Sequence, residues 1–86
     1  MMYIAIHFML DLTETNIPTV SIVAKGEDRA EVMSNMIKAY SAYVGWNSYD
    51  EFKKECPDVI RQIEKDGYAA VDFEDSQIDF WTVKEV

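Results

Sequence analysis

The stretch that decides the fold is residues 28–45, DRAEVMSNMIKAYSAYVG. Asp28 is a favoured N-cap residue, and Glu31 follows it at the spacing of a capping box. Apolar side chains then recur at intervals of three and four residues as far as Val44, which is typical of a helix with one buried face. Gly45 supplies the residue type that most often ends a helix. The pattern predicts a helix over residues 29–44.

A second helical stretch begins a few residues later. Ser48 opens another capping box, and Asp50 and Glu51 occupy the first turn, where the helix dipole favours carboxylates. Pro57 then removes a helical hydrogen bond and disfavours helix at the residue before it. We therefore expect a break, after which Pro57 opens a second short helix that ends at Gly67.

Predicted strands precede these helices. Residues 3–10 alternate between two faces that are both fairly apolar, which suits a strand covered by helices on one side and partly covered on the other. Residues 18–24 form the next predicted strand, with Val20 and Ile22 expected to face the core. The polar connector 11–17 joins the two strands into a predicted hairpin.

A second predicted hairpin follows the helices. Its arms are residues 68–73 and 77–83, and its turn is residues 74–76. In the second arm Trp81 points away from Phe80, so we expect Trp81 to be partly exposed. The order ββααββ, with the helix pair open to division into three, predicts one α+β domain over residues 1–86. Its sheet is expected to be antiparallel, with the helices packed on one face.

Composition limits the possible partners. The chain has 86 residues, 49% of them hydrophobic, and a net charge of −8 from 16 acidic and 8 basic side chains. Clustered Lys and Arg are needed to bind nucleic acid or an anionic membrane directly, so both are excluded as direct partners. No apolar run reaches the length of a membrane span. The single cysteine, Cys56, forms no intramolecular disulfide, and we expect a cytoplasmic protein.

The sequence contains no catalytic or cofactor motif. His7 lies on an apolar predicted strand, which is typical of a hydrogen-bonded core histidine, and Cys56 is expected to be a half-buried structural residue. A phosphate-binding glycine loop, a nucleophile elbow and a Cys/His metal spacing are all missing from the sequence. We predict a protein that is not an enzyme and that uses no cofactor or metal.

A stretch without basic residues separates Lys65 from Lys84. It carries five carboxylates among aromatic residues, which are Asp66, Asp72, Glu74, Asp75 and Asp79. Three interpretations are open: a solvated face that keeps the protein soluble, a surface complementary to a basic groove, and a divalent-cation site. The spacing does not match an EF-hand loop, so metal is a weak signal.

The docking interpretation assigns a role to seven residues. Four carboxylates of this hairpin contact the partner, Trp81 is the apolar anchor, and two carboxylates of the second helix are secondary contacts. The carboxylates are Asp72, Glu74, Asp75 and Asp79 from the hairpin, and Asp50 and Glu51 from the helix.

Residues 31–54 resemble a known class of proteins. The segments MIKAY at 36–40, GWN at 45–47 and YDEF at 49–52 are similar to small acidic phage proteins that inhibit CRISPR nucleases. This resemblance implies stoichiometric inhibition, in which a carboxylate-rich surface imitates DNA phosphates and occupies the basic PAM-reading groove of Cas9. The chain departs from the class because Lys53, Lys54 and Arg61 dilute the helix charge and two further strands follow.

Two hypotheses follow from the sequence. The first is a small acidic, non-enzymatic inhibitor from a phage or mobile element, which docks on a basic protein surface such as that of a nucleic-acid-binding nuclease. The second is a homo-oligomeric structural or assembly protein that pairs through an edge strand, with its acidic face serving solubility only. The sequence leaves the oligomeric state and the identity of the partner open.

Overall fold

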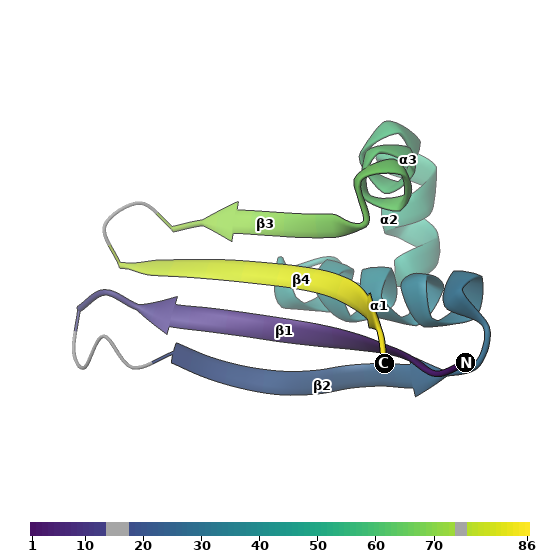
Figure 1. Cartoon of the computed structure of the whole chain (residues 1–86). Helices are drawn as coiled ribbons and strands as arrows, with labels where there is room; N and C mark the ends of the chain where they lie inside the picture. The colour runs from purple at the N-terminus through teal and green to yellow at the C-terminus, as the bar shows by residue number, and fades with distance from the viewer. Residues whose placement is uncertain (14–17, 74–75) are drawn as a thin grey trace.

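The computed structural model of the chain describes residues 1–13, 18–73 and 76–86. Its elements run in the order ββαααββ, as Figure 1 shows. They are β1 (Tyr3–Asp11), β2 (Pro18–Gly26), α1 (Arg29–Tyr43), α2 (Tyr49–Glu55), α3 (Pro57–Asp66), β3 (Tyr68–Asp72) and β4 (Gln77–Glu85). The α+β class is confirmed. The exact order ββααββ is not matched, because Cys56 separates α2 from α3, and this division is the break that Pro57 was expected to cause.

The four strands form one antiparallel sheet in the order β2-β1-β4-β3. The central strands β1 and β4 pair without interruption, from Tyr3 opposite Glu85 to Asp11 opposite Gln77. In Figure 1 the helix α1 passes behind the sheet, and α2 and α3 gather at the end of the sheet where β3 begins. One face of the sheet is therefore covered by α1, and the other face is turned toward the viewer.

Local signals in the sequence explain where the helices begin and end. The Asp28 side chain accepts a hydrogen bond from the backbone N–H of Ala30 at 3.0 Å, and Ser48 Oγ accepts one from Glu51 N–H at 3.1 Å. Both predicted N-caps are thus confirmed. Pro57 is the first residue of α3, and Gly67 ends that helix at a φ of 79°, a left-handed conformation that glycine adopts without strain.

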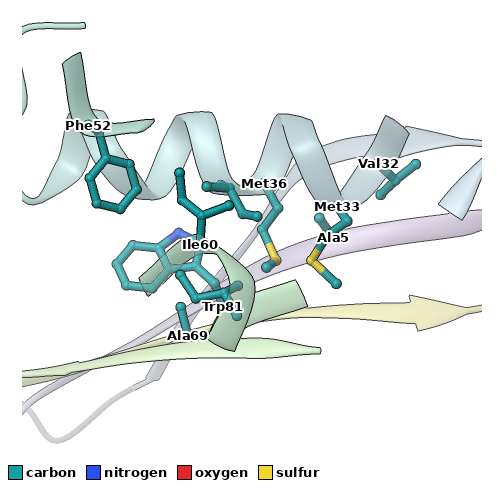
Figure 2. Close-up of a cluster of buried hydrophobic side chains, with 10 residues drawn as sticks. Ala5, Val32, Met33, Met36, Phe52, Ile60, Ala69 and Trp81 are labelled. Carbon is teal, nitrogen blue, oxygen red and sulfur yellow. The ribbon is translucent and has the colours of Figure 1, made fainter. Parts of the chain in front are cut away.

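The core lies between α1 and the sheet, as Figure 2 shows. It consists of ten buried apolar side chains, which are Ala5, Val32, Met33, Met36, Ile37, Phe52, Ile60, Ile63, Ala69 and Trp81. Trp81 is the largest of these side chains, and the ring of Tyr40 meets its indole edge-on at 5.3 Å. Aromatic pairs in this geometry stabilise a core beyond their buried area.

A β-bulge in β2 reverses one prediction. The pairing between β1 and β2 shifts between Ala5 opposite Ala24 and Ile6 opposite Ile22, which leaves Val23 as an extra residue. One inserted residue moves every side chain on the far side of the bulge to the other face of the sheet. Ile22 is therefore 63% exposed. The expectation that this residue and Val20 face the core is wrong.

The faces of β4 are also the reverse of the expectation. Trp81 is 1% exposed and Asp79 is fully buried, because both point toward the helices. On the neighbouring strand Ala69 lies directly opposite Trp81, and its small side chain leaves room for the indole. The expectation that Trp81 is partly exposed is wrong, and it is Ile78 on the other face that is exposed.

Candidate functional site

The sheet face opposite α1 presents apolar side chains in register across four strands. We call this surface the open face and define it by four rows of paired residues. The first row is Lys25, Ile4 and Lys84. The second row is Ile22, Ile6, Thr82 and Tyr68. The third row is Val20, Phe8, Phe80 and Ala70. The fourth row is Pro18, Leu10, Ile78 and Asp72.

The two middle rows expose large apolar groups to solvent. Val20 is 57% exposed beside Ile22, and Tyr68 is exposed at the other edge of the same surface. The rings of Tyr68 and Phe80 stack across β3 and β4, with centroids 5.2 Å apart and an angle of 21° between the planes. Scattered apolar residues on a surface are ordinary, but a contiguous apolar patch of this kind marks an interaction site.

Among the described rows, the charged side chains of the open face lie at its two ends. Lys25 and Lys84 flank Ile4 in the first row, and Asp72 lies in the fourth row. All three charged side chains are exposed. From the usual strand spacing and rise, the four rows cover about 500 Å². The open face is therefore an apolar surface with one positive and one negative end.

The helix-facing side of the sheet holds a polar cluster instead. The buried carboxylate of Asp79 is within 2.7 Å of His7 Nε2 and accepts a hydrogen bond from Gln77 Nε2, also at 2.7 Å. Gln77 donates a second hydrogen bond to the hydroxyl of Tyr43 at 2.5 Å. The His7 ring stacks on the indole of Trp81, with centroids 4.2 Å apart and only 4° between the planes. The cluster joins β1, β4 and the last turn of α1.

The surroundings of Tyr43 in this cluster perturb the pKa of its hydroxyl group. Burial raises the pKa of Tyr43 above its usual value near 10, and a hydrogen bond to Asp79 and the charge of that carboxylate raise it further. The hydrogen bond from Gln77 acts in the opposite direction on the same pKa. The net effect holds the phenol in its protonated form, in which it can donate to Asp79.

A histidine oriented by a buried carboxylate is also part of many catalytic triads. A triad needs a nucleophile within hydrogen-bond reach of the imidazole. Over the described ranges 1–13, 18–73 and 76–86, no serine, threonine or cysteine makes a hydrogen bond to His7. Among these same residues every buried polar side-chain atom has a partner. The cluster is thus a satisfied network that fixes His7 between Asp79 and Trp81, as expected for a core histidine.

The structure separates the residues to which the sequence assigned partner contacts. Asp72 is exposed at the end of β3, whereas Asp50 and Glu51 are exposed in the first turn of α2. Figure 1 places α2 near the start of β3, away from the end of β3 where Asp72 lies. The described carboxylates of the two groups therefore do not share one surface.

The other four assigned residues divide into two pairs. Glu74 and Asp75 lie outside the described residues. Asp79 and Trp81 are buried beneath α1, so neither meets a partner at the surface, and the expectation that Trp81 is an exposed anchor is corrected. Apart from Asp72, the residues of the open face were not predicted from the sequence to contact a partner. The signal that pointed to them was the apolar character of both faces of residues 3–10.

A cavity of about 310 Å³ lies between α3 and β3, and its lining includes Val59, Ile63 and Tyr68. Within the described part of the chain, no group of three His, Cys, Asp or Glu side chains is placed to hold a metal ion. None of the described helices has the length and apolar character that a membrane span requires.

Comparison with protein-family models, with curated proteins and with solved structures finds no match to this chain.

Proposed function

We propose that this protein is a small non-enzymatic binding module whose docking surface is the open face. The observation that carries the proposal is the exposure of Val20 and Ile22 within a sheet face of in-register apolar rows. A sheet with two apolar faces is stabilised when both are covered, and α1 covers one of them. A partner that covers the second face would remove these side chains from water, which is the main favourable term in association.

The charge distribution supports the same proposal. The polar cluster of His7 and Asp79 is turned toward α1, whereas the middle of the open face carries no charged side chain among its described rows. Depletion of charge at the centre and polar groups at the rim are typical of protein–protein interfaces. A cytoplasmic location, which the lone Cys56 suggests, belongs to this proposal as well.

One substitution and a matched control test this function. Ile22→Lys places a charge in the middle of the open face, and Ser21→Lys places the same charge on the adjacent residue, which is exposed on the opposite side of β2. The measurement is a pull-down with each of the three proteins immobilised. We expect wild type and Ser21→Lys to retain the same partner protein, and Ile22→Lys to lose it. Equal retention by Ile22→Lys and wild type, with both folded by circular dichroism, would contradict the proposal.

The second candidate is the acidic inhibitor implied by the resemblance. Its support is the net charge of −8 together with the exposure of Asp50, Glu51 and Asp72. A protein of this class would bind the basic groove of a Cas9-type nuclease, and its inhibition would weaken as salt increases. Nuclease assays at low and high salt test it. Inhibition by wild type that is lost in Asp50→Lys/Glu51→Lys would support this function, and a lack of inhibition at any salt concentration would exclude it.

A further inference from the structure

We propose that the occupant of the open face is a second copy of this chain. The inference rests on the proposed function, because it names the partner of the same docking surface. The two copies pack face to face about a two-fold axis, which lies between the sheets and runs across the strands. This rotation places each strand over its own counterpart and reverses the order of the rows, so that the first row of one copy faces the fourth row of the other.

The charges at the ends of the open face are self-complementary in this arrangement. The positive first row, with Lys84 on β4, meets the negative fourth row of the second copy, with Asp72 on the adjacent strand β3. The symmetry repeats this contact at the other end of the interface, as it does in every isologous dimer. Opposite charges at the rim steer association and select one relative orientation of the two surfaces.

The alternative two-fold axis, parallel to the strands, lacks this complementarity. It would superpose equivalent rows and bring Lys25 and Lys84 of both copies to the same end. Like charges placed together at an interface oppose association. The charge pattern therefore favours the axis that runs across the strands.

On β3 and β4, the side-chain sizes in the middle rows agree with the same axis. The second row of one copy faces the third row of the other. On β3 this places Tyr68 over Ala70, and on β4 it places Phe80 over Thr82. A large side chain thus faces a small one on both strands. Sheets that pack face to face interdigitate their side chains in this way, at a separation of about 10 Å.

The size of the surface is also adequate. The open face of about 500 Å² on each copy gives about 1,000 Å² for the pair, which reaches the lower limit for a specific protein–protein interface. A dimer of this size is expected to dissociate on dilution. Its mass should therefore depend on the protein concentration.

The first experiment is sedimentation equilibrium at concentrations from roughly 10 µM to 1 mM. We expect wild type and Ser21→Lys to approach about 20 kDa, twice the 10.0 kDa of one chain, and Ile22→Lys to stay at the mass of one chain. Ile22 is exposed, so its replacement leaves the core intact. A wild-type chain that remains monomeric to about 1 mM overturns the inference, and so does an Ile22→Lys variant that dimerises as well as wild type.

A charge exchange tests the orientation of the two copies. Lys84→Asp places two carboxylates together at each end of the interface, and Asp72→Lys places two ammonium groups there. We expect each variant alone to dimerise about 10-fold or more weakly than wild type. An equimolar mixture should form a heterodimer, because each new charge then faces its opposite. Failure of the mixture to dimerise more strongly than either variant alone overturns the proposed axis.

The experiments distinguish a wrong dimer proposal from a wrong docking surface. If the wild-type chain is monomeric, the second copy is excluded as the occupant, yet the partner-retention comparison of Ile22→Lys with Ser21→Lys still decides whether the open face is a docking surface. If that comparison shows no difference either, both the inference and the proposed function are wrong.

Discussion

At the scale of single residues, Asp79 is a carboxylate that the fold buries completely. Acidic side chains are rarely fully buried unless they are paired, and Asp79 is paired with His7, Gln77 and Tyr43. These partners come from β1, β4 and α1. A single carboxylate therefore links the two central strands to the helix that covers them.

Asp79→Ala should lower the free energy of unfolding by about 2–4 kcal/mol, because it leaves buried or half-buried hydrogen-bonding groups without their acceptor. Glu64→Ala, an exposed carboxylate on α3, is the control and should change stability by less than about 0.5 kcal/mol. Urea unfolding of both variants at one protein concentration measures the difference. If Asp79→Ala lowers the free energy of unfolding no more than Glu64→Ala does, the buried cluster contributes little to stability.

The second prediction at this scale is a pH dependence of stability that arises from Tyr43. Its pKa in the folded protein is raised above the usual value near 10 by burial and by Asp79. The unfolded chain therefore releases the phenolic proton at a lower pH than the folded chain does. The contribution of Tyr43 to the free energy of unfolding is fully present below the pKa that Tyr43 has in the unfolded chain. It is lost as the pH rises through the pKa of Tyr43 in the folded protein.

The wild type should accordingly lose stability relative to Tyr43→Phe as the pH rises above about 10. Urea unfolding of both proteins from about pH 8 to pH 11 measures the difference. Tyr43→Phe keeps the ring but has no phenolic proton to release. The difference in stability between the two proteins therefore removes the contributions of all other titrating groups. Parallel stability curves for the two proteins would refute a raised pKa at Tyr43.

At the scale of elements, the helix ends were predictable because each depends on one or two neighbouring residues. The N-cap side chains of Asp28 and Ser48 and the proline at the start of α3 act within a few residues of themselves. The faces of β2 were not predictable in this way. The extra residue Val23 reverses them, and alternation read directly from the sequence assumes a strand without a bulge.

The faces of β4 were missed for a related reason. Ile78 and Phe80 on one face and Trp81 on the other are all large and apolar, so alternation alone does not tell which face meets a helix. The choice depends on Ala69 of the neighbouring strand, which gives the indole space. That pairing is a long-range contact and is absent from the local pattern. The open face was missed as well, because Val20 and Ile22 in its middle rows were assigned to the core.

The prediction at this scale concerns the effect of the N-cap of α2 on stability. Ser48→Ala removes the hydroxyl that accepts from Glu51 N–H, and we expect a loss of about 1 kcal/mol in the free energy of unfolding. Ser48→Asp supplies another acceptor at the same position and should restore most of the stability. Equal stability of all three proteins in urea would mean that the cap does not hold α2 in place.

At the scale of the whole molecule, the fold has two sides with different properties. One side of the sheet is closed by α1 over a core that contains Trp81, and the other is the open face with its charged ends. The net charge of −8 keeps an exposed apolar surface from driving indiscriminate association. A specific face-to-face dimer would use that surface and leave the helices outward for further contacts.

An isotope-filtered NOE measurement on an equimolar mixture of labelled and unlabelled chains tests the face-to-face dimer directly. We predict intermolecular NOEs between Tyr68 and Ala70 and between Phe80 and Thr82, because these pairs face each other across the proposed axis. Intermolecular NOEs confined to other surfaces, such as the edge of β2, or their absence at about 1 mM protein, would contradict it.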